Sequence, residues 1–257
     1  MMAYRALTFF DLDGTLLDAH SQVTPEVADA MQQLKQNDIL PIIATGRTEP
    51  EVQHIMEAAK IESDIVMNGA FIRVNGTEIH SDRLDPELCR NVYEAVLENG
   101  DQLSYYNENN IWCTGYNDEL INAYQFIHSQ IPPIDPLAFE KYPVNMLLVL
   151  GKNNEGFYEE RFPELNFFRN TPYSLDTVKK SVSKGNAVTI LKQAMNLENV
   201  PTYGFGDGPN DLALLQACDT KIAMANGAPV LKEIADFVTK KNTEGGILHA
   251  LCHFDLL

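Results

Sequence analysis

The chain has 257 residues, 45% of them apolar and 21% charged, and carries a formal net charge of −17 at pH 7. This globular composition with an excess of acids argues against a nucleic-acid or anionic-membrane surface, because both need clustered lysine and arginine. No apolar run approaches the roughly 20 residues of a membrane span, the N-terminus lacks a signal-peptide pattern, and the four cysteines are scattered, so we expect a cytoplasmic protein with reduced thiols.

Two acids follow the first apolar strand of the chain. The run that ends at Phe10 has the character of a buried strand, and Asp11, Asp13 and the turn-forming Gly14 come directly after it. Two acids at the end of a buried strand are costly unless a cation or a reaction needs them. An acidic loop that caps the next helix is the simpler alternative at this point.

A repeating strand and helix pattern continues from this turn. Thr24 caps a helix that begins at Pro25, an apolar strand spans 39–44, a second helix follows Thr48, and a third short strand spans 65–67. Continuous apolar strands of this kind predict a parallel sheet covered on both faces, with its ligand crevice at the carboxyl ends of the strands. The polar residues expected at that edge are Asp11, Asp13, Thr45 and Arg47.

The pattern changes from about Phe71. Asn75-Gly76 is typical of a hairpin turn, and a helix is expected from Asp85-Pro86 to Asn99-Gly100. Further elements are expected as strands at 103–106, 111–113 and 144–150 and near Phe167 and Tyr173, and as a helix over 119–128. We therefore predict an α/β core domain formed by residues 1–82 and 183–257, with an inserted α+β domain at 83–182.

The parallel pattern resumes after Ser183. A helix through Met195 begins beside Lys184 and Gly185, and the strand over 202–205 leads into the acidic segment Gly206–Asp211. The last strands of the sheet are expected at 222–224 and 237–239. Asp207 and Asp211 thus join the group of polar residues expected at the ends of parallel strands.

These residue types suit phosphoryl transfer. Asp11 and Asp207 offer oxygen ligands to a hard divalent cation such as Mg²⁺. The Asp11 carboxylate is the candidate nucleophile, and Asp13 is the candidate proton donor and acceptor. Thr45, the Gly46 amide and Lys184 would hold the oxygens of the transferring group. Taken singly, Thr45 also suits a helix cap, and Lys184 a solvated surface lysine.

The order of these clusters resembles a known family. Asp11-Leu12-Asp13-Gly14-Thr15-Leu16, Thr45-Gly46-Arg47, Lys184-Gly185 and Gly206–Asp211 are similar to the four ordered motifs of the haloacid dehalogenase (HAD) superfamily. The insertion resembles a C2-type cap, as in the Cof-type (IIB) phosphatases, and Asn68-Gly69-Ala70 and Met224–Gly227 also resemble stretches of that subfamily.

The resemblance implies a Rossmann-like HAD core with a substrate-selecting cap, and a phosphatase that acts through an aspartyl-phosphate on small phosphorylated metabolites such as sugar phosphates. It implies Asp11 as nucleophile and Asp13 as acid and base. The metal positions that it implies are Asp11, the Asp13 carbonyl and Asp207, with Asp211 supporting the metal or Lys184. The substrate-binding positions are Leu12, Thr45, Gly46, Arg47, Lys184 and Asn210. Pro209 departs from the usual motif but lies between the ligand positions.

Two other functions share parts of this pattern. A receiver-type phosphoacceptor lacks an acid two residues after the acceptor and lacks a cap, whereas this chain has Asp13 and an insertion. A phosphosugar mutase on the same scaffold returns the phosphoryl group to its substrate. The partner expected is therefore a small phosphorylated metabolite, with no nucleic acid or membrane partner, and the protein itself is expected as a monomer or homodimer.

Overall fold

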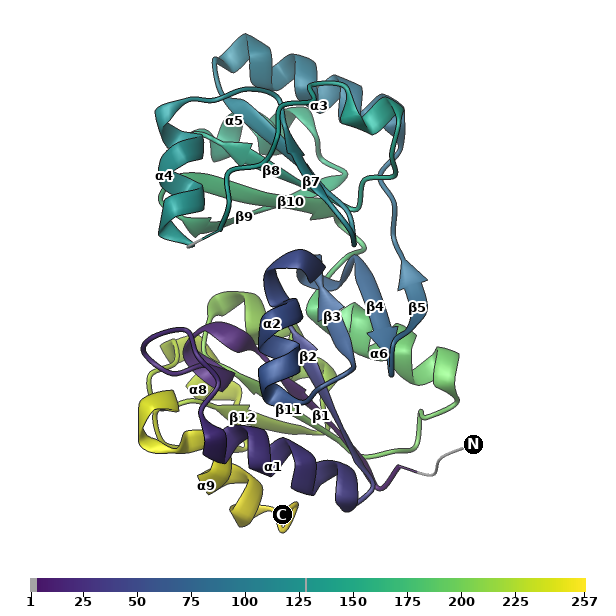
Figure 1. The fold of residues 1–257 in the computed structure, drawn as a ribbon, viewed down its shortest axis with the longest axis vertical. Coiled ribbons are helices and arrows are strands. Elements are labelled where there is room, and N and C mark those ends of the chain that lie inside the picture. The colour runs from purple at the N-terminus through teal and green to yellow at the C-terminus, as the bar shows by residue number, and fades with distance from the viewer. Residues whose placement is uncertain (1–3, 128) are drawn as a thin grey trace. The chain divides into compact units, whose positions relative to one another are not determined.

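The computed structural model describes residues 4–127 and 129–257, and the chain divides into two compact units (Figure 1). The first unit comprises the residues up to Arg47, Val52–His80 and Ser183–Leu257. The second comprises Thr48–Glu51 and Ser81–Val182. The first holds a mainly parallel sheet between helices and the second an antiparallel sheet with helices, so the predicted α/β class with an inserted α+β unit is confirmed.

The eight strands of the first unit lie in the order β13-β12-β11-β1-β2-β3-β4-β5. The six strands from β13 to β3 are parallel to their neighbours, and β4 is antiparallel to β3. The strands span Ala6–Phe10 (β1), Ile39–Ala44 (β2), Asp64–Val66 (β3), Phe71–Val74 (β4), Thr77–Ser81 (β5), Thr202–Gly206 (β11), Thr220–Ala223 (β12) and Phe237–Val238 (β13). The chain reaches the centre of this sheet twice, first with β1 and, after the second unit, with β11.

Helices cover this sheet because its central strands are apolar on both faces. All five residues of β1 and all six of β2 are buried. On one face, Leu7 and Phe9 of β1 belong to a core that includes Val188 and Leu191 of α6 and Leu214 of α7. The helices span Pro25–Gln36 (α1), Glu49–Ala59 (α2), Lys184–Met195 (α6), Leu212–Ala217 (α7), Pro229–Ile234 (α8) and Gly246–His253 (α9).

The β4–β5 hairpin extends the sheet beyond its parallel part. Asn75 and Gly76, which join the two strands, both have positive φ angles, of 48° and 76°. A type I′ turn requires this conformation at both central residues, which is why Asn-Gly is favoured there. The hairpin predicted from these two residues is confirmed.

The second unit has a core of its own. Its sheet has the order β7-β6-β8-β10-β9, and β6 and β10 both pair antiparallel with β8. Leu103, Tyr105, Leu147 and Leu175 of this sheet pack into one buried cluster together with Val92 of α3. The elements span Pro86–Asn99 (α3), Gln102–Tyr106 (β6), Ile111–Cys113 (β7), Asp118–Phe126 (α4), Met146–Leu150 (β8), Glu155–Arg161 (α5), Leu165–Thr171 (β9) and Ser174–Lys179 (β10).

Several boundaries in the second unit differ from those expected. Helix α4 ends at Phe126, and His128, the expected last residue, lies outside the described residues. Tyr173, expected in a strand, lies in the turn between β9 and β10, where its amide donates to the Thr171 hydroxyl at 3.2 Å. Helix α5 was not expected, because seven residues that include a glycine give too short a periodic pattern.

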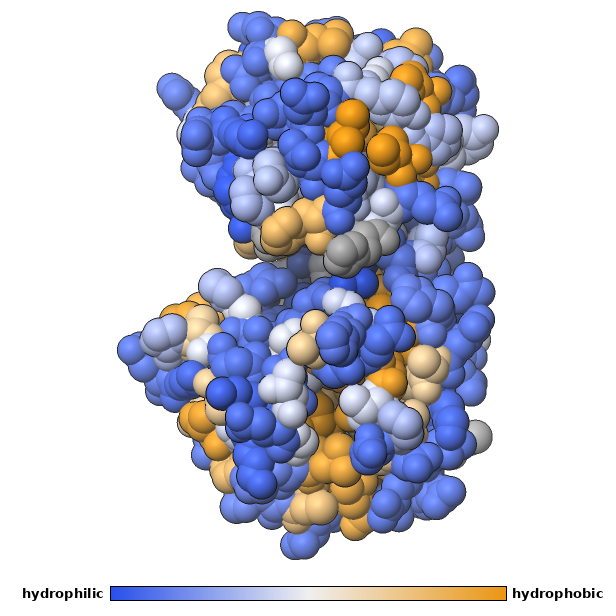
Figure 2. Space-filling view, turned by 60° about the vertical axis from the view of Figure 1, so that its left-hand side comes forward, coloured by the Kyte–Doolittle hydropathy of each residue, from blue (hydrophilic) through white to orange (hydrophobic). Residues whose placement is uncertain are grey.

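The face drawn in Figure 2 is mainly hydrophilic, with apolar side chains gathered in a few patches between polar ones. None of the helices in the described ranges is both long enough and apolar enough to cross a membrane. The described cysteines are free thiols, of which only Cys252 is exposed.

Candidate active site

The carboxyl ends of β1, β2 and β11 bring the predicted site residues to one edge of the sheet. Phe10 pairs with Phe205 on one side and with Ile43 on the other. Asp11 therefore leaves β1 beside the end of β11, where Asp207 follows, and beside the end of β2, where Thr45 follows. The expected convergence depends on β1 lying between these two strands, as it does in Figure 1.

Lys184 links two of the acids. It is the first residue of α6, and its ammonium Nζ lies 2.6 Å from Asp11 Oδ1 and 2.6 Å from Asp211 Oδ1. All three residues are buried, with Lys184 only 1% exposed. A lysine placed in this way is not the solvated surface residue of the simpler alternative, since a buried ammonium needs partners of opposite charge.

The charges at this edge do not balance. Asp11, Asp207 and Asp211 each offer an oxygen atom, and these three atoms lie within 4.8 Å of one another. Burial raises the pKa of Asp11 to about 8, and the neighbouring Asp211 carboxylate adds to the rise while Lys184 opposes it. Burial also raises the pKa of Asp207 to about 6. Three carboxylates, two of them buried and Asp207 half-buried, therefore lie close together with one ammonium.

Such an oxygen donor set fits a hard divalent cation. Mg²⁺ prefers carboxylate and carbonyl oxygens and accepts few protein ligands. An added positive charge would also keep Asp11 and Asp207 ionised, because an opposite charge within a few ångströms favours the charged form of a carboxyl group. The residues best arranged to hold the ion are Asp11 and Asp207.

Asp211 is engaged mainly in holding other parts of the site. Its Oδ1 binds Lys184, and its Oδ2 accepts hydrogen bonds from the amides of Asp207 and Gly208, both at 3.0 Å. Asp211 was expected to support either the metal or Lys184. These bonds favour the second role, together with support of the loop that carries Asp207. Burial lowers the pKa of Lys184, but Asp11 and Asp211 together raise it above its ordinary value, so the lysine stays charged.

The turn after β1 is built around Asp207. Residues Leu12–Leu16 form a tight helical turn in which Gly14 has a φ of 80°. A Cβ atom on Gly14 would lie 2.3 Å from Asp207 Oδ2, so a side chain here would displace the Asp207 carboxylate as well as strain the main chain. The next residue, Thr15, donates its hydroxyl to Asp207 Oδ1 at 2.9 Å. The turn and the Asp207 carboxylate thus fix each other.

Asp13 is paired with Arg47. The guanidinium group donates from Nε to Asp13 Oδ2 at 2.9 Å and from Nη2 to Oδ1 at 2.5 Å. This two-pronged geometry matches the fork of arginine to the two oxygens of a carboxylate. The Asp13 side chain is 54% exposed and that of Arg47 is 22% exposed. Arg47, expected to contact the substrate, is therefore joined in this structure to the predicted acid and base.

The remaining predicted residues lie in the turns around this cluster. Thr45 is buried, and its hydroxyl accepts a hydrogen bond from the Arg47 amide at 3.1 Å, which closes the turn that contains Gly46. Asn210 is half-buried in the short helical turn Pro209–Asp211. The Leu12 side chain is fully buried, so a contact of this residue with a substrate falls to its main chain.

Three supporting residues were given no role by the sequence. Thr15 binds Asp207, as described above. Asn226 donates to the Gly14 carbonyl at 2.7 Å and accepts from the amide of Asn242 at 3.1 Å, while Asn242 donates to the Leu17 carbonyl at 2.8 Å. Thr15 and Asn226 belong to the family-like segments, which is a signal that could have found them. Asn242 carries no such signal.

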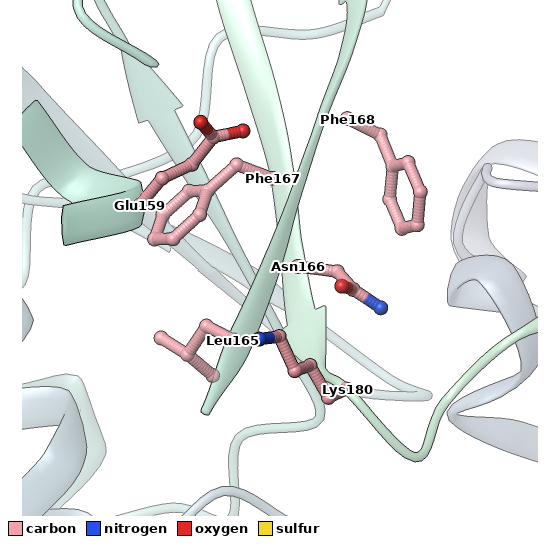
Figure 3. A pocket seen from close by; sticks show the side chains of 6 residues that line it. All are labelled: Glu159, Leu165, Asn166, Phe167, Phe168 and Lys180. Carbon is pink, nitrogen blue, oxygen red and sulfur yellow. The ribbon is translucent and has the colours of Figure 1, made fainter. Parts of the chain in front are cut away.

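A separate cavity lies in the second unit and has different chemistry. It has a volume of about 220 Å³ and lies along β9, with a lining made up of Glu159, Leu165, Asn166, Phe167, Phe168 and Lys180. Figure 3 shows that Phe167 and Phe168 leave opposite faces of the strand. The lining contains a single acid, so it offers neither a metal site nor a nucleophile paired with a base.

Comparison with known proteins agrees with this geometry. Residues 8–251 match the family model of the haloacid dehalogenase-like hydrolases. YkrA of Bacillus subtilis (strain 168), whose name marks it as a candidate phosphatase, is 29% identical over 252 residues, which cover 98% of each chain.

Solved structures give the same result at the level of the fold. A hypothetical protein from Geobacillus kaustophilus HTA426 superimposes with a TM-score of 0.92 at 29% identity, over 98% of this chain and 100% of the other. The HAD subclass IIB sugar phosphatase BT4131 superimposes with a TM-score of 0.85 at 23% identity, over 98% of this chain and 100% of its own. With its ordered motifs, its inserted cap unit and the match over almost its whole length, the chain belongs to the haloacid dehalogenase-like hydrolases and is a phosphatase of that family.

Proposed function

We propose that this phosphatase is Mg²⁺-dependent and hydrolyses small phosphorylated metabolites, sugar phosphates among them, through an aspartyl-phosphate on Asp11. The observation that carries the proposal is the group of buried Asp11, half-buried Asp207 and buried Asp211 near Lys184. Three carboxylates beside one lysine need further positive charge, which either a proton or a bound cation can supply. A bound Mg²⁺ ion would supply that charge and neutralise the phosphate of the substrate.

Asp11 is the proposed nucleophile. Its carboxylate attacks phosphorus, a new O–P bond forms, and the bond between phosphorus and the leaving oxygen breaks. Lys184 lies 2.6 Å from one of the carboxylate oxygens, where it holds that oxygen in place. Its third N–H, which neither Asp11 nor Asp211 uses, can donate to the phosphate. Lys184 thus holds the side chain of Asp11. The main chain of Asp11 is held by the Phe205 carbonyl, which accepts a hydrogen bond from the Asp11 amide at 3.1 Å.

Asp13 is the proposed acid and base. It gives its proton to the leaving oxygen in the first step and takes a proton from the attacking water in the second, so that Asp11 and inorganic phosphate are released. Its exposed position suits this exchange with water. The exposed side chain must first part from Arg47, at least partly, in order to carry a proton.

The substrate class has its own support. BT4131, which shares this fold, is described as a sugar phosphatase. We propose that the inserted unit, residues 83–182, selects the leaving group, because it has a core of its own and lies in the chain between the two halves of the catalytic unit. A panel of phosphorylated metabolites ranked by kcat/KM would identify the substrate.

The proposal is tested by removing the metal and the nucleophile separately. We expect EDTA to abolish hydrolysis and Mg²⁺ to restore it. Asp11→Asn should form no phosphoenzyme in rapid-quench experiments with intact-mass detection, because an amide cannot replace the carboxylate in the attack. Asp29→Asn is the matched control, since Asp29 is a surface acid of α1 with a side chain 79% exposed, and it should keep full activity. Full activity in metal-free buffer, or phosphorylation of Asp11→Asn, would contradict the mechanism.

A further inference from the structure

The turn Met67–Gly69, directly after β3, has an unusual main chain. Its three residues have consecutive positive φ angles of 51°, 56° and 108°. No other run of three such residues occurs in residues 4–127 or 129–257. Glycine and asparagine tolerate this conformation, but methionine does not favour it, and Met67 is fully buried. A strained main chain of this kind persists only where the surrounding contacts hold it.

One side of this turn holds the Thr45–Arg47 turn. The amide of Met67 donates to the Arg47 carbonyl at 2.9 Å, and the amide of Asn68 donates to the Thr45 carbonyl at 3.0 Å. Two successive amides therefore bind two carbonyls of the segment that contains Thr45 and Gly46. This arrangement requires the left-handed main chain, because φ and ψ set the direction in which each amide points.

The other side of the turn lies against the start of α6. A Cβ atom on Gly69 would be 2.5 Å from the Ser183 carbonyl oxygen and 3.2 Å from Ala187 Cβ. Ser183 caps α6, since its hydroxyl accepts from the Asn186 amide at 3.0 Å and its carbonyl accepts from the Ala187 amide at 3.0 Å. The residue that follows Ser183 is Lys184, so Gly69 touches the main chain that carries the lysine.

We propose that the Met67–Gly69 turn is a positioning element for phosphate binding. It sets the spacing between the Thr45–Arg47 turn and Lys184, the two groups that the sequence predicts to hold phosphate, and this inference rests on the proposed function. No residue of the turn needs to touch the substrate for this role. The strained main chain lets two amides of the turn bind the Thr45–Arg47 segment while Gly69, which has no Cβ, lies against Ser183.

The test compares two glycines with the same kind of main chain. Gly69→Ala places a Cβ against the Ser183 carbonyl, whereas Gly76→Ala places one at a φ of 76° where no described atom lies within 4 Å. Both variants gain a strained alanine in the same unit, but only the first displaces the start of α6. We expect Gly69→Ala to lower kcat/KM for p-nitrophenyl phosphate by about a hundredfold, because a displacement of about 1 Å in an active site has an effect of that size.

Binding of inorganic phosphate gives a measurement that is independent of turnover. In isothermal titration calorimetry with Mg²⁺, Gly69→Ala should bind phosphate more weakly than the wild type, and Gly76→Ala should bind it as the wild type does even where its melting temperature falls. Equal phosphate affinities for the two variants would overturn the inference. A wild type that binds phosphate without hydrolysing any phosphomonoester would overturn the proposed function and leave this inference standing.

A second pair of variants covers the case in which Gly69→Ala does not fold. Asn68→Gly and Asn68→Ala both remove the side chain, but only glycine keeps a φ of 56° without strain. We expect Asn68→Gly to bind phosphate more tightly than Asn68→Ala. In most places in a folded chain, glycine is the less favourable of the two, so this order would not arise from a general loss of stability. The opposite order, or equal affinities, would contradict the role of the turn.

Discussion

At the scale of single residues, the pair of Asp13 and Arg47 decides how the proton is handled. In this structure the guanidinium group binds both oxygens of the Asp13 carboxylate. An arginine in that position fixes the direction of the carboxylate and occupies both of its oxygens. We therefore propose that Arg47 acts through Asp13, in addition to any contact with the substrate.

A double-mutant cycle separates these two roles of Arg47. We expect Asp13→Asn to reduce the hydrolysis of alkyl phosphates by roughly 10²–10⁴-fold, the usual contribution of general acid-base catalysis. Arg47→Lys keeps the positive charge but cannot form the two parallel hydrogen bonds to the Asp13 carboxylate. If Arg47 acts through Asp13, Arg47→Lys should have little further effect in the Asp13→Asn background. Additive effects on kcat/KM would assign Arg47 to the substrate alone.

The leaving group offers an independent check on Asp13. Nitrophenolate needs little protonation when it departs, so Asp13→Asn should still be phosphorylated by p-nitrophenyl phosphate and should then lose the phosphate slowly. The time course of nitrophenol release by Asp13→Asn should therefore show a burst without sustained turnover. Turnover of alkyl phosphates by Asp13→Asn at the wild-type rate would show that another group moves the proton.

At the scale of secondary-structure elements, the antiparallel pair of β3 and β4 carries a buried ion pair at its start. Asp64 pairs directly with Arg73, whose Nη2 lies 3.1 Å from Asp64 Oδ2. The Asp64 side chain is fully buried, and burial raises its pKa to about 7. The positive charge of Arg73 acts against this rise.

The raised pKa of the buried Asp64 predicts a dependence of stability on pH. The pKa of Asp64 is higher in the folded protein than the value of about 3.9 for an exposed aspartate. The folded state therefore binds the proton more tightly, and its stability falls as pH rises from about 4 to about 7. Asp64→Asn should lose this part of the dependence, so the wild type should lose stability relative to the variant between pH 5 and pH 7.5. Urea unfolding of both proteins at pH 5 and pH 7.5 measures this loss of stability. The same difference in unfolding free energy between wild type and variant at both pH values would contradict the prediction.

The success of the sequence-based prediction varies from element to element for physical reasons. Helix α3 was predicted with both ends because Asp85 caps its first turn and Gly100 ends it in the left-handed conformation, and both signals are local. The central parallel strands β1 and β2 were predicted because each is a mostly apolar run. The strand β10 was predicted too early along the chain, because the apolar Tyr173 lies in a turn fixed by Thr171.

The contacts of the site were less predictable than its members. The grouping of Asp11, Lys184 and Asp207 follows from residues that stand at the ends of parallel strands or at a helix start, so it could be expected from the pattern. The pairing of Asp13 with Arg47 and the strain at Met67 depend on side-chain and main-chain angles that no periodicity reports. Asn242 belongs to the site only because the C-terminal segment folds back onto the turn at Leu17.

At the scale of the whole molecule, the insertion has the features of an independent unit. Its core includes residues of both its sheet and its helices. Its two ends are joined by Lys179 Nζ, which donates to Asp82 Oδ1 at 2.7 Å. Asn145, from the middle of the unit, holds the first end by donating to the Ser81 hydroxyl at 2.9 Å. A segment with its own core and adjacent ends is the kind that tolerates transfer between proteins.

We therefore expect residues 81–182 to fold when they are expressed alone, with a cooperative thermal transition in circular dichroism. A core protein in which a short glycine-serine linker replaces 83–182 should keep hydrolysis of p-nitrophenyl phosphate while losing its ranking of natural substrates. The folded state of that protein is checked by the same melting measurement. An unchanged substrate ranking in the folded, shortened protein would show that the insertion does not select the substrate.

The position of β11 beside β1 has a consequence for synthesis on the ribosome. These neighbouring strands are separated by almost 200 residues of chain, so β1 waits roughly 10–40 s for its partner at ordinary rates of translation. During that interval one hydrogen-bonding edge of β1 stays open in the nascent chain, while the insertion has time to complete its own core. The early half of the catalytic sheet is therefore the part of this protein that chaperones would need to protect.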